Sequence, residues 1–225
     1  GEICDILEKN HVTAVELGAQ STNDKVLAMN RRGHTREDIF RSARLLKERG
    51  FELGLQMMTG LYGSNDEDSI GTARDIISLS PDTARIYPTV VIENTELAEL
   101  YRNGEYRPQT PEEAAVLCAK ILPMFERAGI KVIRLGLHSG GDVEGSFVAG
   151  AYHPALREMC EGHIYFDIIN RALSGKEKGK YIIYVAPREV SKASGQRRCN
   201  IEKLRELGYE CRRKENAALS ARDIT

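Results

Sequence analysis

Polar side chains occupy alternate positions of the apolar stretch Thr13 to Gln20, where a ligand-binding strand would carry them. The apolar positions are Val15, Leu17 and Ala19, and the intervening ones are Glu16, Gly18 and Gln20. Because side chains alternate across a β-strand, the apolar row can pack on helices while Glu16 and Gln20 share the opposite face. A purely structural strand of a parallel sheet is usually apolar on both faces. The pattern therefore favours a ligand site over a simple core.

Three later stretches repeat this alternation, namely Glu52 to Met58, Thr83 to Pro88 and Lys131 to His138. In the last, we expect Ile133, Leu135 and Leu137 to form the apolar row, with Val132, Arg134, Gly136 and His138 opposite. In (β/α) barrels, the C-terminal strand ends and the loops after them build the active site. We therefore expect one concave space to be lined by Glu16, Gln20, Gln56, Tyr87 and Arg134.

The segments between these strands carry helix boundary signals. Thr35 begins a capping-box pattern whose helix ends at Gly50, and a second helix is expected over Asp66 to Ser80, before Pro81. Thr110 precedes a proline at a first helical position, and this helix should run to Gly129. Strand and helix in alternation predict right-handed βαβ units around a parallel sheet, an α/β fold.

The composition is that of an ordinary globular protein, with 29% charged and 41% hydrophobic residues. No apolar run approaches the roughly 20 residues that span a bilayer, and no signal or lipidation motif is present. Five scattered cysteines without metal-site spacing indicate reduced thiols, so we expect a cytoplasmic location and no membrane partner. The chain begins inside an apparent helix, Glu2 to Glu8, without an initiator Met. We interpret it as the later part of a longer polypeptide.

Five short motifs of the first half of the chain carry a family resemblance, namely Val15–Ser21 (VELGAQS), Asn30–Thr35 (NRRGHT), Gly60–Gly63 (GLYG), Arg85–Leu97 (RIYPTVVIENTEL) and Gly104–Pro108 (GEYRP). Together they resemble the radical S-adenosylmethionine (SAM) enzymes, nearest the Elongator catalytic-subunit-like proteins and more distantly the oxygen-independent coproporphyrinogen III oxidases. The resemblance covers Val12 to Pro111, with weaker similarity to about Met159, and is far more specific than a lone glycine signature.

The resemblance implies a partial (β/α)6 TIM-like barrel. In this family a 4Fe–4S cluster reduces SAM, and the resulting radical abstracts hydrogen from the substrate. The cluster is held by three cysteines in a CxxxCxxC loop, which this chain lacks. We expect those cysteines upstream, so that this chain holds no metal ligand and is inactive by itself.

The resemblance also assigns cofactor-binding positions for SAM, namely Glu16, Gln20, Arg32, Gln56, Tyr87 and Pro88. Glu16 and Gln20 match places near the ribose and methionyl groups, and Arg32 matches an arginine that can pair with the methionine carboxylate. Gln56 stands where relatives carry Asp or His, and Tyr87 with Pro88 matches the adenine side.

The residues by themselves leave structural alternatives open. Arg32 could be a solvated charge at a helix end, and Tyr87 a core aromatic with a satisfied hydroxyl. Glu16 could be paired with Arg85 or Arg134 inside the barrel.

Two histidines, His138 and His153, invite a metal-site interpretation, but their spacing matches no known ligand pair. We interpret them as loop or capping residues. Gly140–Gly141 is typical of a flexible loop or a simple turn.

The sequence changes character after Met159, so we expect two domains, an incomplete barrel over 1–159 and a basic α/β extension over 160–225. Within the extension, Ile164–Leu173 and Asn200–Leu207 are expected helices, Tyr181–Val185 and Tyr209–Arg213 are expected strands, and these strands are candidates to continue the sheet. From Arg171 to Lys214 there are 13 Lys or Arg against 5 Glu, a net of +8 in a chain of net −1. The asymmetry favours an anionic partner such as tRNA or another RNA, and the alternative is a solvated basic face.

Two hypotheses of different class therefore stand. The first is a portion of a radical SAM enzyme acting on RNA or a small metabolite. The second is a non-catalytic nucleic-acid-binding module on a degenerate barrel. A conventional barrel lyase is disfavoured because no phosphate-binding glycine loop or paired carboxylates stand at the strand ends. The acetylation chemistry of Elongator is not carried over, since Ser194–Arg198 makes no coenzyme A loop.

Overall fold

The computed structural model describes residues 1–138 and 145–225, which form two compact units, Gly1–Pro154 and Ala155–Thr225. The division after Met159 that the sequence suggested falls inside the first long helix of the second unit, α8 (Leu156–Leu173). Tyr165, Ile169 and Leu173 of that helix pack in the core of the second unit, and the two units divide just before the helix begins.

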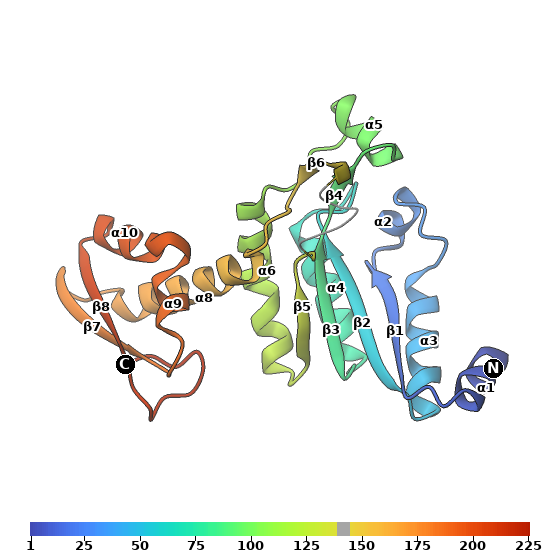
Figure 1. Cartoon of the computed structure of the whole chain (residues 1–225), viewed down its shortest axis with the longest axis horizontal. Coiled ribbons are helices and arrows are strands. Elements are labelled where there is room, and N and C mark those ends of the chain that lie inside the picture. Colours follow the sequence, from blue (N-terminus) through green and yellow to red (C-terminus); the bar gives the residue numbers. More distant parts are fainter. Residues whose placement is uncertain (139–144) are drawn as a thin grey trace. The chain divides into compact units, whose positions relative to one another are not determined.

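The first unit is built on a parallel sheet with the strand order β1-β2-β3-β5 (Figure 1). Its strands are β1 (Ala14–Gln20), β2 (Glu52–Thr59), β3 (Thr83–Pro88) and β5 (Lys131–Leu135). The prediction of βαβ units around a parallel sheet is confirmed. Within the described residues only β2 pairs with β1, so the other edge of β1 is open.

Helices cover one face of this sheet, because α3 packs on β1 and β2, α4 on β2, and α6 on β5. The helices of this unit are α1 (Glu2–Lys9), α2 (Asp24–Met29), α3 (Arg36–Glu48), α4 (Asp66–Ser78), α5 (Glu96–Arg102) and α6 (Pro111–Arg127). Thr35 and Thr110 cap α3 and α6 in capping boxes, as predicted. The core lies between sheet and helices, where Leu53, Leu55 and Met57 are fully buried.

The alternation predicted for β5 is wrong. Val132 and Leu135 are buried with the helix-facing row, whereas Ile133 is 41% exposed. The register with β3 shifts between Ala84 and Arg85, so β5 holds one extra residue there. Such a bulge places two consecutive residues on one face, here Ile133 and Arg134, and breaks the period of two.

A small antiparallel pair, β4 (Val90–Ile92) with β6 (Phe147–Gly150), follows the sheet and was not predicted. It packs with α5 in a cluster around Val91, Ala98 and Tyr106. The Tyr106 hydroxyl donates to the Gly60 carbonyl at 2.6 Å, and burial raises the pKa of Tyr106 to about 12. This cluster therefore fixes the loop that leaves β2.

The second unit is one βαβ crossover packed on α8. Two parallel strands, β7 (Gly179–Val185) and β8 (Tyr209–Glu215), are joined by α9 (Val190–Ser194), a 3-10 turn (Gln196–Arg198) and α10 (Cys199–Glu206). The expectation that these strands continue the first sheet is wrong, since they form a separate two-stranded sheet. The core of the unit includes Tyr165, Ile169, Val185 and Leu204.

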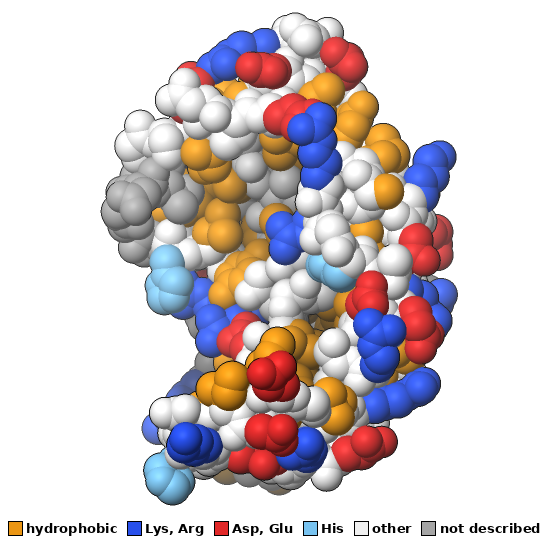
Figure 2. All heavy atoms as spheres, turned by 90° about the vertical axis from the view of Figure 1, so that its right-hand side faces the viewer, with side chains coloured by type: hydrophobic (Ala, Val, Ile, Leu, Met, Phe, Trp, Pro, Cys, Tyr) orange, Lys and Arg blue, Asp and Glu red, His pale blue; other side chains and the backbone are white. Residues whose placement is uncertain are grey.

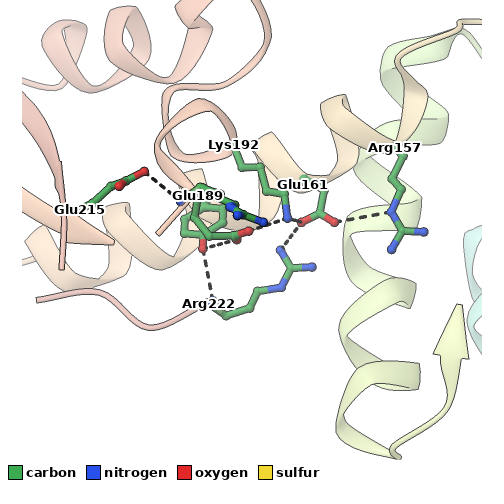
Figure 3. A network of polar contacts seen from close by, with 8 residues as sticks. Arg157, Glu161, Glu189, Lys192, Glu215 and Arg222 are labelled. Atoms are coloured by element: carbon green, nitrogen blue, oxygen red, sulfur yellow. Dashed lines mark hydrogen bonds and ion pairs between the residues drawn. The ribbon is translucent and has the colours of Figure 1, made fainter. Parts of the chain in front are cut away.

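A buried ionic network ties the C-terminal tail to α8 and α9 (Figure 3). Glu161 is only 5% exposed, and its Oε2 lies 2.7 Å from Arg222 Nη1 and 3.7 Å from Lys192 Nζ. Lys192 also pairs with Glu189 at 2.7 Å, and the Tyr165 hydroxyl donates to Glu189 at 2.6 Å. Burial and the bond to Glu189 raise the pKa of Tyr165, so it remains a donor.

In the part of the chain that the structure describes, no helix is both long and apolar enough to cross a membrane.

Candidate cofactor-binding site on the uncovered face of the sheet

The face of the sheet that lies opposite α3, α4 and α6 carries polar side chains from neighbouring strands. Arg85 of β3 lies between Glu16 of β1 and Tyr87, with Arg85 Nε 2.8 Å from Glu16 Oε1 and Nη1 donating to the Tyr87 hydroxyl at 3.2 Å. Nε is buried and makes no hydrogen bond within the described residues, so Glu16 holds it by charge. The contact with Tyr87, with a smaller contribution from Glu16, raises the pKa of Arg85. The structural pairing of Glu16 with Arg85, one of the sequence alternatives, is confirmed.

Simple strand alternation does not account for the position of the Gln20 side chain on this face. The register between β1 and β2 shifts between Gly18 and Gln20, and Gln20 adopts a left-handed φ of 62°. Its side chain, 4% exposed, folds back over Gly18, and Gln56 Nε2 donates to Gln20 Oε1 at 3.5 Å. The two amides therefore lie together at the C-terminal end of β1.

Two glycines leave room for these long side chains. A Cβ on Gly18 would lie 2.6 Å from Gln20 Nε2, and a Cβ on Gly54 would lie 3.2 Å from Glu16 Cγ and 3.1 Å from Thr83 Oγ1. Contacts under 3.0 Å essentially never occur, so Gly18 is required by the observed position of Gln20. Glycine in a strand often marks such a close approach.

The loop between α2 and α3 carries Arg32 beside the end of β1. His34 fastens this loop, because its ring nitrogens lie 3.1 Å from the Arg32 carbonyl and 3.2 Å from the Ala19 carbonyl. Arg31 pairs with Glu96 of α5 at 2.6 Å, whereas the exposed Arg32 side chain has no carboxylate partner within the described residues. Arg32 thus offers an unpaired guanidinium close to the strand that carries Gln20.

The remaining predicted positions divide between the faces. Tyr87 shares the uncovered face with Arg85, while Pro88 is buried in the row of Ala84 and Ile86. Arg134 stands next to Arg85 in register, with its Nε donating to the Gly136 carbonyl at 3.2 Å. The helix-facing position of Pro88 leaves its backbone, rather than its ring, for any contact on the uncovered face.

A cavity of about 330 Å³ lies beyond the C-terminal end of β2. It is lined by the loop Gly60–Asp66 and by residues from Glu105 to Gln109. The Asn30 side chain donates to the Tyr62 carbonyl at 2.8 Å, which ties this loop to the end of α2. The three segments that follow β1, β2 and β4 are therefore joined at one end of the sheet.

Residues 1–138 and 145–225 contain no group of three or more His, Cys, Asp or Glu side chains that could hold a metal ion. His138 is exposed at the end of the segment that follows β5, and His153 is half-buried. The pair Gly140–Gly141 lies outside the described residues. All five cysteines are free, and burial raises the pKa of Cys118 to about 12, which opposes its use as a thiolate ligand.

The surface around α1 and α3 carries charges of both signs. Figure 2 views the right-hand side of Figure 1, where acidic and basic side chains are intermixed. This face therefore offers no large surface of single charge for a polyanion.

A parallel sheet with helices on one face and polar side chains on the other is the arrangement found in part of a (β/α) barrel. The Radical SAM superfamily model matches residues 1–76, and the model of the Radical SAM C-terminal domain matches residues 81–165. The chain belongs to the radical SAM superfamily, a family of enzymes, and its fold is a partial TIM-like barrel with a C-terminal extension.

Its relatives are Elongator-like. The tRNA uridine(34) acetyltransferase of Methanocaldococcus jannaschii is 37% identical over 121 residues, which cover 51% of this chain and 22% of that protein. Elongator complex protein 3 of Homo sapiens is 33% identical over 121 residues, covering 50% and 21% respectively. The structure of archaeal Methanocaldococcus infernus Elp3 with an N-terminal deletion is similar at 30% identity and a TM-score of 0.61, covering 76% of this chain and 39% of that one. The chain thus spans between about a fifth and a third of the length of the curated relatives it matches.

Sequence reasoning missed His34 and the role of Gly18. Both lie within the segments that carry the family resemblance, Asn30–Thr35 and Val15–Ser21. The available signal for Gly18 was a glycine two residues before Gln20, because a Cβ there would meet the Gln20 side chain in its observed position.

Proposed function

We propose that the full-length protein containing this chain is a radical SAM enzyme that reductively cleaves SAM at a 4Fe–4S cluster, and that its substrate is a tRNA. The observation that carries the SAM site is the juxtaposition of the Gln20 and Gln56 amides at one strand end, next to a loop with the unpaired Arg32. Family membership supports the cofactor pair, and the names of the relatives support tRNA.

The residues of this chain fit SAM but not the cluster. Gln20 and Gln56 supply hydrogen-bonding groups suited to ribose hydroxyls, and Arg32 supplies a planar guanidinium suited to the methionyl carboxylate. Tyr87, and the backbone of Pro88, would stand on the adenine side. Glu16 already faces Arg85, so its contribution would be to hold the charged Arg85 in place beneath the ligand.

The 4Fe–4S cluster needs thiolates that this chain does not group together within the described residues. We therefore assign the cluster ligands to a segment outside this chain and derive no step from it here. When bound, the cluster supplies the electron for SAM cleavage. We place the protein in the cytoplasm because its proposed substrate is tRNA.

The test compares two neighbouring arginines of one loop in the full-length protein with its cluster reconstituted. Arg32→Ala removes a charge-assisted contact worth about 1.5–3 kcal/mol, so SAM affinity should fall roughly ten- to more than a hundredfold. Arg31→Ala removes a neighbouring exposed charge that pairs with Glu96, and it should change SAM affinity by less than about threefold. Calorimetry measures both, and 5′-deoxyadenosine release on reduction reports turnover.

Equal SAM affinities for Arg32→Ala and the unmutated protein would remove Arg32 from the site. Absence of 5′-deoxyadenosine from the unmutated, cluster-loaded protein would overturn the radical-enzyme proposal. If the full-length sequence also lacked a CxxxCxxC loop, the non-catalytic nucleic-acid-binding module would replace it.

A further inference from the structure

The second unit contains a basic cavity of about 670 Å³ beside β8 and α10. It opens between the edge of the small sheet and the start and middle of α10. Its charged lining consists of five cations and one carboxylate, namely Lys180, Arg198, Arg205, Arg212 and Arg213 with Glu210. This cavity forms no part of the SAM site, which lies in the first unit.

Most of these cations lack a counter-charge. Lys180 faces Glu210 at 3.9 Å with both side chains largely exposed, a pair of little strength. Arg198, Arg205 and Arg212 are exposed and have no carboxylate partner among residues 1–138 and 145–225. The cavity therefore carries a net positive charge that the described residues do not neutralise.

Arg213 is the most strongly constrained of the set. Its Nη1 donates to the Cys211 carbonyl at 2.7 Å, while its Nε is buried without a hydrogen-bond partner within the described residues. Burial, together with the nearby positive charge of Arg198, lowers the pKa of Arg213. Two neighbouring positive charges repel each other, and a buried N–H donor without an acceptor costs free energy. A bound anion would offset both costs.

The backbone beside the cavity also adopts a conformation that costs free energy. Arg197 and Arg198 both lie in the left-handed region, with φ of 50° and 67°. Non-glycine residues seldom adopt this conformation, and it persists where surrounding structure enforces it. The buried Asn200 anchors the helix that follows them, because its Nδ2 donates to the Gly162 carbonyl at 2.8 Å and the Ala193 carbonyl at 3.3 Å.

We propose that this cavity binds phosphate groups of an RNA backbone, and that it is the contact through which the second unit engages the proposed tRNA substrate. The proposal deepens the proposed function and rests on it for the identity of the RNA. Arginine suits phosphate because its planar donors can bind two oxygens at once.

A polymer fits this cavity better than a free nucleotide. Sites for small ligands bury most of the ligand in an enclosed and mostly apolar pocket. Here four of the five cations are exposed at the rim, so the positive charge is spread along a surface rather than focused on one group. Phosphate contacts of this kind position a nucleic acid without reading its sequence.

The test uses the 225-residue chain and fluorescence anisotropy with tRNA at several salt concentrations. Arg198→Ala/Arg205→Ala removes two exposed cavity charges, and the matched control, Arg171→Ala/Lys176→Ala, removes two exposed charges of the same basic segment outside the cavity. The cavity variant should bind tRNA at least about tenfold more weakly. Its salt slope should fall by about 1.4–1.8, since each lost phosphate contact releases about 0.7–0.9 fewer counterions. The control should change affinity by less than about threefold.

Equal losses of tRNA affinity in the two variants would overturn the cavity as the binding site and would indicate that tRNA binds a diffuse basic surface. Saturable binding of AMP or inorganic phosphate with no tRNA binding would overturn RNA as the occupant. Circular dichroism confirms that each variant is folded. SAM binding, measured separately in the full-length protein, distinguishes failure of this proposal from failure of the enzyme proposal, because the cavity variant should bind SAM normally.

Discussion

The substitution Gly18→Ala tests whether the position of Gln20 matters for SAM binding. A Cβ at this position would lie 2.6 Å from Gln20 Nε2, so the Gln20 amide must move by several tenths of an ångström. The atom it meets is the far end of a flexible side chain, and the backbone of Gly18 is not left-handed. The fold should therefore lose less than about 1 kcal/mol, offset in part by the lower entropy of the unfolded chain.

Displacing the amide should cost the proposed site one hydrogen bond to the ligand. A net hydrogen bond contributes about 0.5–1.5 kcal/mol, so the dissociation constant for SAM should rise roughly two- to twelvefold. The assay is calorimetry on the full-length, cluster-loaded protein, with Tm measured alongside to separate binding from stability.

The matched control is Gly71→Ala on α4, where an added Cβ meets nothing within 4 Å. Alanine has the higher helix propensity, so this variant should be slightly more stable and bind SAM normally. Unchanged SAM affinity in Gly18→Ala, with a displaced Gln20 in its structure, would refute the placement of Gln20 in the site.

Two further predictions concern the network of Figure 3. Glu161→Gln removes the negative charge that Arg222 and Lys192 face. The local stability of the C-terminal tail should therefore fall by about 2–3 kcal/mol. This is less than the roughly 3–5 kcal/mol expected for a fully buried pair, because these cations are part-exposed. Hydrogen exchange of peptides over 216–225 measures this loss of stability. The control is Glu210→Gln, which removes the carboxylate of an exposed pair with Lys180 and should cost less than about 0.5 kcal/mol. Equal effects of the two substitutions would contradict the argument. For Glu189, burial acts to raise the pKa, but the hydrogen bonds from Lys192 and Tyr165 win and hold it below its ordinary 4.5. Its stabilisation should thus be complete above pH 4.5 and be lost as the pH falls below that value, and acid unfolding of Glu189→Gln that matched the unmutated chain would contradict this.

The sequence was sufficient to predict the first sheet because its signals are local and mutually consistent. Capping boxes at Thr35 and Thr110 and strands with buried alternate residues follow from side-chain chemistry within a few positions. The family resemblance, rather than periodicity, supplied the partial barrel and the SAM positions.

The failures came from features that no local pattern encodes. Strand alternation assumes a period of two, and the bulge that sets Ile133 beside Arg134 depends on pairing with β3. The same kind of irregularity at Gly18 and Gln20 carries the Gln20 side chain onto the uncovered face despite its left-handed backbone. The separation of β7 and β8 into their own sheet depends on which elements pack together, which alternation does not determine.

The distribution of charge supports separate roles for the two units in the two proposals. The unit Ala155–Thr225 has 15 Lys or Arg against 10 Asp or Glu, a net of +5, and the unit Gly1–Pro154 has 17 against 23, a net of −6. An RNA backbone is attracted to the basic unit and repelled by the acidic one, whereas SAM recognition needs only a few placed groups such as Arg32. Affinity for RNA should consequently respond to changes in the basic cavity, and affinity for SAM to changes near Gln20. A substitution in one unit that altered both affinities would show that the two proposed sites are coupled.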